Sequence, residues 1–422
     1  MYAKIFNEIV SITHHDYSGS EDKRGWDNPE KYKAQIALLE ERNQLTPGAF
    51  TNLVQDYLLD FKDRHMYFKL TGSEEHKVHD NGFQVKRFGD KLYITHVSKE
   101  ERVTIGDVIL SLDNKPISEL TRKHKRELIE DVAERENWKQ VIQKYSNCEV
   151  RDINGMIKMI DLKQYEKSKY VPQHTVQKVN NDTLLMTLSD FSSLTAIPDL
   201  IADVEEELQT VPNLIIDVRE NIGGSDAAYK ELMPYLFPEG STHVTFEDSM
   251  HSYHCTRRNF ELTKKSLGQF MEEVQDDELK EYIHKFMVKF EESVGNGYTI
   301  LFEEPPAMTI EGKKFPKQVV VLTDVNCASA GEDFVESCKK STKATVVGRP
   351  TAGVNNYSNL TIMEWGGLFE LWYPTSRIEY GLSKKDRITN KGIAPDIYIP
   401  WTPQHVTEDV DLKRAIEFLH SS

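Results

Sequence analysis

One serine of this sequence stands where a fold can expose a nucleophile. Residues 317–334 (KQVVVLTDVNCASAGEDF) predict a buried apolar strand, a short turn that carries Ser329, and the start of a helix. The first N–H groups of such a helix can stabilise an oxyanion. The hydroxyl of Ser329 could therefore attack a carbonyl carbon, although the commoner role of a serine before a helix is to cap it.

A second segment carries two adjacent glycines. Residues 213–225 (NLIIDVRENIGGS) predict another apolar strand, followed by a loop that holds Gly223 and Gly224. Glycine lets the backbone approach a ligand closely and turn an N–H outwards, as an oxyanion hole requires. The ordinary alternative is a tight turn between a strand and a helix.

Together the two segments resemble the core of the C-terminal processing (tail-specific) peptidases and of the tricorn core protease. The motifs that carry the resemblance follow in the family's order: residues 217–224 (DVRENIGG), 328–332 (ASAGE), 344–353 (ATVVGRPTAG), 392–397 (GIAPDI) and 411–415 (DLKRA). The resemblance implies an α/β fold with a ClpP/crotonase-like β-α-β core. It also implies a serine peptidase that needs no cofactor and no metal.

The resemblance makes Ser329 the nucleophile, and a serine hydroxyl needs a base within hydrogen-bond reach. One branch of the family uses a lysine after the Pro-Thr-x-Gly turn, where this sequence has Val354, so a lysine dyad is not expected. The tricorn-like branch uses a histidine, and residues 63–66 (DRHM) resemble its Asp-x-His segment. The resemblance therefore implies His65 as the general base, a role that suits an imidazole.

The imidazole of a catalytic histidine must also be oriented by an acceptor at its second nitrogen. The tricorn-like enzymes use a relay with a glutamate just before the Gly-x-x-Pro-Asp motif, where this sequence has Thr389. Asp63, Glu364 and Glu370 are the other candidates, and the sequence does not choose among them. Glu332, on the helix after the nucleophile, is expected to be structural.

These parts predict a serine endopeptidase that acts on peptides or unfolded proteins through an acyl-enzyme. The backbone N–H of Ala330 and that of Gly223 or Gly224 would hold the oxyanion. The alternative is a catalytically inactive binding protein on the same fold, for peptides or apolar ligands, since the interphotoreceptor retinoid-binding protein has a similar core. A third hypothesis is a scaffold protein that only recruits partners.

A second module is expected before this core. Residues 106–116 (GDVILSLDNKP) resemble the strand-and-turn core of a PDZ domain, which binds peptide C-termini by adding a strand to a sheet edge. Residues 81–83 (NGF) are the candidate carboxylate-binding loop. A purely structural module is the alternative.

The elements that would position these residues fall into three expected domains. They are an N-terminal helical segment (1–75), an inserted PDZ-like domain (76–166) and the protease core (167–422), in which strands and helices alternate as in a largely parallel sheet. Strands are expected at 184–188, 214–218, 319–322 and 345–347. An acidic, amphipathic helical insertion at about 257–297 interrupts the core and is either a lid or a surface elaboration.

Two further parts of the sequence contain residue types that could take part in chemistry. Residues 14–17 (HHDY) could suggest zinc, but adjacent side chains point apart and no His or Cys set at ligand spacing accompanies them. A solvated turn or part of the site rim is expected there. Cys327 stands two residues before Ser329, and we expect a small buried filler rather than a reactive thiol.

The composition limits the number of domains, the compartment and the kinds of partner to expect. The 422 residues suffice for two or three domains, and 39% hydrophobic content can build their cores. With no apolar run of about 18 residues, no signal-peptide pattern and four scattered cysteines, we expect a cytoplasmic protein without a membrane span. A net charge of −16 argues against nucleic acid and anionic membranes as partners. A homo-oligomer is expected only by analogy with the tricorn-like relatives.

Overall fold

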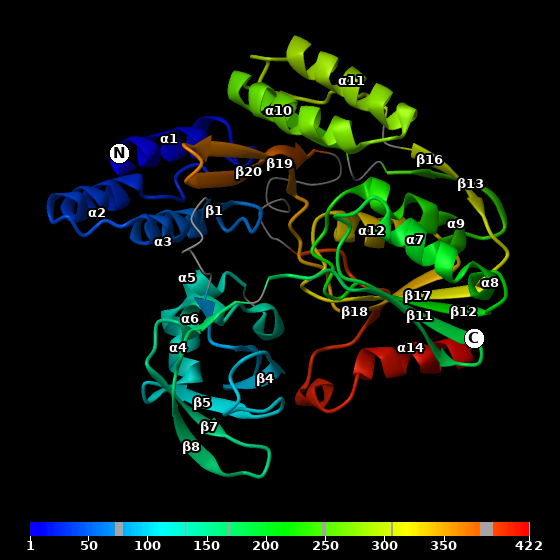
Figure 1. The fold of residues 1–422 in the computed structure, drawn as a ribbon, viewed down its shortest axis with the longest axis horizontal. Coiled ribbons are helices and arrows are strands. Elements are labelled where there is room, and N and C mark those ends of the chain that lie inside the picture. The colour runs from blue at the N-terminus through cyan, green and yellow to red at the C-terminus, as the bar shows by residue number, and fades with distance from the viewer. Residues whose placement is uncertain are drawn as a thin grey trace. The chain divides into compact units, whose positions relative to one another are not determined.

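The computed structural model describes residues 1–71, 79–130, 132–167, 169–246, 250–304, 307–379 and 391–421. The chain forms two compact units, each assembled from separate stretches of sequence (Figure 1). Unit 1 comprises Met1–His76, His243–Thr309 and Gly353–Lys391, and unit 2 comprises Lys77–Thr242, Ile310–Ala352 and Gly392–Ser422. The expected base, His65, belongs to unit 1, and the expected nucleophile, Ser329, belongs to unit 2. The three domain boundaries expected from the sequence stay predictions.

Unit 1 combines helices from the start of the chain with an antiparallel sheet. The helices are α1 (Tyr2–His15), α2 (Pro29–Glu41) and α3 (Pro47–Leu58), followed by the short η1 (Leu59–Phe61). The sheet contains β1 (Tyr67–Leu70), β14 (His251–His254), β15 (Tyr298–Thr299), β19 (Tyr357–Trp365) and β20 (Phe369–Ile378). Asn28 and Thr46 accept hydrogen bonds from the first turns of α2 and α3, and a proline follows each cap.

The core of unit 1 is largely aromatic. Phe50 of α3 packs edge-on against Phe68 of β1 and Phe369 of β20, and Tyr57 of α3 packs against Phe6 of α1. All five side chains are buried. The helices at the start of the chain therefore share one core with a strand that lies some 300 residues later.

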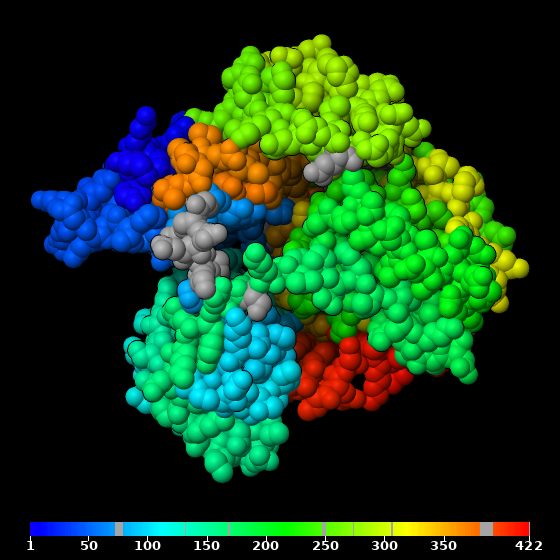
Figure 2. All heavy atoms as spheres, in the orientation of Figure 1, coloured from blue at the N-terminus to red at the C-terminus, as the bar shows by residue number. Residues whose placement is uncertain are grey.

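The expected helical insertion forms α10 (Arg257–Glu273) and α11 (Asp277–Glu292) of unit 1. Asp276 caps α11 by accepting from the N–H groups of Glu278 and Leu279. The apolar side of the pair is buried, and Phe286 packs against Tyr253 of β14. Figure 2 shows both helices at the molecular surface, and charged side chains such as Glu261 and Lys285 are exposed there, so the pair is a typical amphipathic hairpin.

The core of unit 2 is a sheet in the order β10-β11-β12-β17-β18-β21. Its strands are β10 (His174–Asn180), β11 (Thr183–Leu188), β12 (Asn213–Asp217), β17 (Gln318–Thr323), β18 (Ala344–Gly348) and β21 (Ile397–Tyr398). All pairings are parallel except that of the edge strand β10. The predicted α/β core with a largely parallel sheet is thereby confirmed, and each of its four predicted strands is present.

Helices cover both faces of this sheet. Ala415 and Leu419 of α14 (Val410–Ser421) pack against one face, with Val320 and Leu322 of β17. Because side chains alternate along a strand, Val319 and Val321 point to the opposite face, where α12 (Ala330–Lys339) lies (Figure 1). The remaining helices of this region are α7 (Ala196–Asp203), α8 (Glu205–Leu208), η3 (Asp226–Leu232) and α9 (Met233–Leu236).

Unit 2 contains a second, antiparallel sheet, which occupies the position of the expected PDZ-like domain. It consists of β3 (Phe83–Phe88), β4 (Lys91–Val97), β5 (Val108–Leu112), β6 (Lys115–Pro116), β7 (Asn147–Arg151) and β8 (Ile157–Asp161). Short helices α4 (Ile117–Lys123), α5 (Lys125–Leu128), η2 (Ala133–Arg135) and α6 (Lys139–Ile142) accompany it. The buried Trp138 lies in the core between them. We call this part the β3–β8 module.

No helix in the described part of the chain is both long and apolar enough to cross a bilayer.

Candidate active site

Ser329 lies on the turn between β17 and α12, as the sequence predicted. Its backbone has φ 55° and ψ −129°, a conformation that side-chain-bearing residues rarely adopt. Its side chain makes no capping hydrogen bond to α12, although Ser329 is the residue before the helix. The carbonyl of Ser329 instead accepts from the N–H groups of Glu332 and Asp333. The ordinary capping role is therefore not the one that this serine has, and such strained positions often coincide with active sites.

The glycine loop lies directly against this turn. A Cβ atom added to Gly223 would stand 2.6 Å from the Cβ of Ser329 and 2.7 Å from the carbonyl oxygen of Ala328. A Cβ atom on Gly224 would stand 2.2 Å from the carbonyl of Phe191. Both glycines also have positive φ, at 89° and 147°. Only glycine fits at these two positions, so the loop and the serine turn form one assembly.

Gly223 and Gly224 differ in whether the backbone N–H is already hydrogen-bonded within the protein. The N–H of Gly223 donates to Oδ1 of the buried Asn221 at 2.9 Å, and the carbonyl of Asn221 accepts from the N–H of Ala328 at 2.9 Å. Asn221 thus ties the glycine loop to the serine turn and occupies the N–H of Gly223. Gly224 and Ala330 are the remaining candidates for oxyanion donors.

The helix after Ser329 is anchored by a buried carboxylate. Glu332 of α12 accepts a hydrogen bond from the hydroxyl of Thr351, which in turn accepts from the N–H of Ile393 at 2.7 Å. Arg135 of the β3–β8 module donates to the carbonyls of Pro350, Thr351 and Ala352, at 3.1, 2.8 and 3.0 Å. Glu332 thus has a structural role, and it joins the segments around residues 351 and 393 to α12.

Cys327 is buried behind the turn. Burial raises the pKa of its thiol well above the usual value, and the nearby Glu332 carboxylate acts in the same direction. The thiol therefore stays protonated and fills space, as expected.

His65 of unit 1 is held at two points. Its backbone N–H donates to Oδ1 of Asp63 at 2.9 Å, and its ring nitrogen Nδ1 lies 2.7 Å from the carbonyl oxygen of Tyr357. A carbonyl only accepts hydrogen bonds, so Nδ1 carries a proton, and in the neutral ring Nε2 then carries the lone pair. This is the tautomer that a general base needs.

The hydrogen-bond acceptor at Nδ1 of His65 is not Asp63, Glu364 or Glu370, each of which has another partner. Asp63 holds the backbone of His65 rather than its ring. Glu364 pairs with Lys265, and Glu370 pairs with Lys69. Thr389 lies outside the described residues. The acceptor is the main-chain carbonyl of Tyr357, which sequence reasoning missed because any residue supplies a carbonyl.

The solvated turn expected at residues 14–17 is wrong for Asp16 and Tyr17, which are buried, whereas His14 and His15 are exposed at the end of α1. A place of these residues in the site rim stays a prediction. Tyr17 is fully buried, and Asp16 is buried where Thr256 and Arg258 donate to its carboxylate. His14 instead contacts Asp27 at 2.8 Å. These partners come from distant parts of the sequence, which local pattern could not reveal. Among the described residues no group of His, Cys, Asp or Glu is placed to hold a metal ion.

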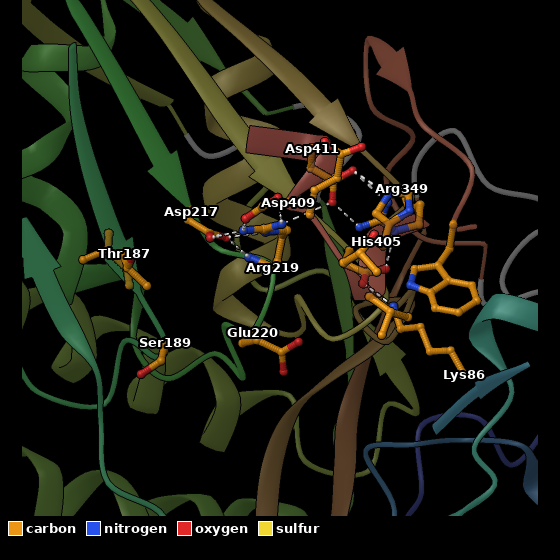
Figure 3. Close-up of a pocket in the computed structure, with 16 residues that line it drawn as sticks. Lys86, Thr187, Ser189, Asp217, Arg219, Glu220, Arg349, His405, Asp409 and Asp411 are labelled. Atoms are coloured by element: carbon orange, nitrogen blue, oxygen red, sulfur yellow. Dashed lines mark hydrogen bonds and ion pairs between the residues drawn. The ribbon is translucent and has the colours of Figure 1, made fainter. Parts of the chain in front are cut away.

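A charged pocket of about 500 Å³ lies in unit 2 at the carboxyl ends of β12, β17 and β18 (Figure 3). Figure 3 shows two arginines of its wall, Arg219 and Arg349, pointing toward aspartates that include Asp409 and Asp411. Asp411 accepts from Arg349 at 3.0 and 2.5 Å and from Arg219 at 3.3 Å. Arg349 also donates to Asp324, the residue after β17. This ion network therefore joins the ends of the strands that carry the site loops.

We expect Asp411→Asn to destabilise the protein by about 3 kcal/mol, because it leaves a buried arginine without its main partner. Burial alone would raise the pKa of Asp411, but hydrogen bonds from His405 and Arg349 outweigh it and hold the pKa well below the usual value. A depressed carboxylate pKa contributes stability above about pH 4 that is lost as the pH falls further. The difference in urea midpoint between parent and variant should be large at pH 7 and should shrink progressively as the pH is lowered below about 4.

The control for this substitution is Asp409→Asn, which removes a carboxylate from the same network. Asp409 is 38% exposed against 1% for Asp411, so a smaller loss is expected. Equal urea midpoints for Asp411→Asn and the parent at pH 7 would contradict the structural role of the network.

Unit 2 thus combines a parallel sheet with a strained serine turn that packs against a glycine loop. Residues 182–399, more than half of the chain, match the model of peptidase family S41. The chain belongs to peptidase family S41. Membership supports hydrolysis of peptide bonds and peptide or protein substrates.

Several solved structures align with almost the whole chain. Mature CPAF complexed with lactacystin has a TM-score of 0.65 at 14% sequence identity, covering 100% of this chain and 97% of that chain. The photosystem II D1 C-terminal processing protease has a TM-score of 0.44 at 13% identity, covering 98% and 96%. The tricorn protease has a TM-score of 0.44 at 11% identity, covering 99% and 36%. No curated protein matches the sequence significantly.

Proposed function

We propose that the chain is a serine endopeptidase in which Ser329 is the nucleophile and His65 is the general base. The observation that carries the proposal is the serine turn. Ser329 has a strained backbone, its side chain does not cap the helix that follows, and a glycine loop packs directly against it. The Nδ1–H tautomer of His65, set by the Tyr357 carbonyl, supports the role of the base.

The proposed reaction proceeds through an acyl-enzyme. Nε2 of His65 takes the hydroxyl proton as the Ser329 oxygen attacks the peptide carbonyl, which requires the two atoms to approach within about 3 Å. The N–H groups of Ala330 and Gly224 stabilise the resulting oxyanion. The imidazolium then returns the proton to the leaving amine. A water molecule, activated by the same nitrogen, hydrolyses the ester and frees the serine.

We propose that the β3–β8 module is PDZ-like and that it serves mainly as framework. In the candidate carboxylate-binding loop, the N–H of Gly82 donates to Asp80 at 2.9 Å, and the side chain of Asn81 donates to the Lys163 carbonyl at 3.1 Å. These groups are engaged within the module itself. Arg135 meanwhile binds the loop at residues 350–352. Support of the core is therefore favoured over capture of a peptide terminus at this loop.

The test is covalent labelling with a fluorophosphonate probe, read by intact mass, on the parent chain and on Ser329→Ala. Such probes react with serines that a base has activated. One adduct on the parent and none on the variant would support the proposal. A folded parent chain that takes up no probe would favour the alternative, an inactive binding protein on the same fold.

A further inference from the structure

The two groups that hold His65 meet at a third side chain. Asp63 binds the backbone N–H of His65, and the Tyr357 carbonyl binds its ring. The Nζ atom of Lys23 lies 3.5 Å from Oδ2 of Asp63 and 4.2 Å from the centroid of the Tyr357 ring. An ion pair and a cation–π contact thus close a ring of four residues: Lys23, Asp63, His65 and Tyr357.

Tyr17 completes the connection between Lys23 and Asp63. Its hydroxyl accepts from Nζ of Lys23 at 2.7 Å and donates to Oδ2 of Asp63 at 2.6 Å. The hydroxyl of Tyr357 donates to Asp22 at 2.9 Å, which anchors this tyrosine beside the lysine. Every member of the assembly belongs to unit 1.

The burial of Lys23 is unusual for its residue type. Its side chain is 1% exposed, whereas lysines are almost never fully buried unless they are paired. Burial lowers the pKa of Lys23, and the Asp63 carboxylate acts in the opposite direction. An apolar residue would fill the same space without this desolvation cost. The polar contacts that Lys23 makes, rather than its volume, are therefore what distinguishes it from a core residue.

We propose that Lys23 is a positioning residue for His65. It fixes Asp63, which holds the backbone of His65, and it fixes the ring of Tyr357, whose carbonyl sets the imidazole tautomer. Without Lys23 the Nδ1–H bond to the carbonyl weakens, and the ring populates the Nε2–H tautomer, which cannot accept the serine proton. The inference rests on the proposed function in one respect, namely that His65 is the base.

The primary variant is Lys23→Met, which keeps the length of the side chain and removes its polar contacts. We expect kcat to fall about a hundredfold with KM nearly unchanged, because the base is misplaced while the substrate surface is intact. In long-range ¹H–¹⁵N spectra at pH 8, the His65 signals should shift from the Nδ1–H pattern toward a mixture of tautomers. The spectrum of His65→Gln identifies these signals.

A matched pair of variants keeps the test informative if Lys23→Met does not fold. Tyr17→Phe and Tyr57→Phe each remove one hydroxyl from a fully buried tyrosine of unit 1 that donates to an aspartate, Asp63 and Asp27 respectively. Only Tyr17 belongs to the assembly. We expect Tyr17→Phe to move the His65 nitrogen signals and to lower kcat, and Tyr57→Phe to leave the His65 signals in place.

Each outcome decides the inference. His65 signals that stay at parent positions in Lys23→Met or Tyr17→Phe overturn it, as does an equal shift in Tyr17→Phe and Tyr57→Phe. The nitrogen spectra need no substrate. If the parent chain neither hydrolyses peptides nor takes up the fluorophosphonate, the proposed function fails, while the spectra still report whether Lys23 positions the imidazole.

Discussion

Ser329→Ala is expected to lower peptide hydrolysis by at least about a thousandfold, because no other group replaces the attacking oxygen. The fold should survive, since the Ser329 side chain does not cap the helix that follows. Initial rates on fluorescein-labelled casein, measured beside urea unfolding, separate the two effects. Hydrolysis at the parent rate would exclude Ser329 as the nucleophile.

The glycine substitution at the same position tests the strain. Ser329 has φ 55° and ψ −129°, a conformation that glycine reaches without a Cβ penalty. We expect Ser329→Gly to be as inactive as the alanine variant but more stable than the parent by about 1 kcal/mol, since such strain costs about 1–3 kcal/mol. Ser337→Gly, within α12, is the matched control and should destabilise by about 1 kcal/mol. A urea midpoint of Ser329→Gly below that of the parent would show that the turn stores no strain.

His65→Gln is the second large effect that we expect. Glutamine can still donate a hydrogen bond but cannot take up the serine proton, so kcat should fall about a thousandfold with little change in KM. Initial rates over a range of casein concentrations measure both constants. His284→Gln, which alters an exposed histidine of α11 in the same unit, is the control and should leave both unchanged. If His65→Gln kept more than a tenth of the parent kcat, the base would have to be another group.

The core of unit 2 could be predicted because its signals are local. Apolar runs gave the positions of β11, β12, β17 and β18, and the serine and glycine motifs follow directly on two of these strands. Parallel strands bring their carboxyl ends to one edge of a sheet, so motifs far apart in the sequence meet there. The packing of Gly223 against Ser329 is the result.

The surroundings of His65 could not be predicted, because the residues that form them are far apart in the sequence. The acceptor for its ring is a carbonyl, which has no residue signature, and it lies 292 positions away. Lys23 and Tyr17 stand in an irregular polar stretch that reads as exposed loop, and only their contacts with Asp63 explain why both are buried. Polar side chains that are satisfied by distant partners leave no periodic pattern for sequence reasoning to use.

The separation of His65 and Tyr357 in the sequence sets the order in which the parts of the site are translated. Because the ribosome makes the chain from its N-terminus, His65 emerges early, but the carbonyl that sets its tautomer is made only after Ser329. A nascent chain that already carries the proposed nucleophile therefore still lacks the carbonyl that orients the proposed base. If the two residues act as proposed, we expect the site to be complete only after residue 357 has been translated.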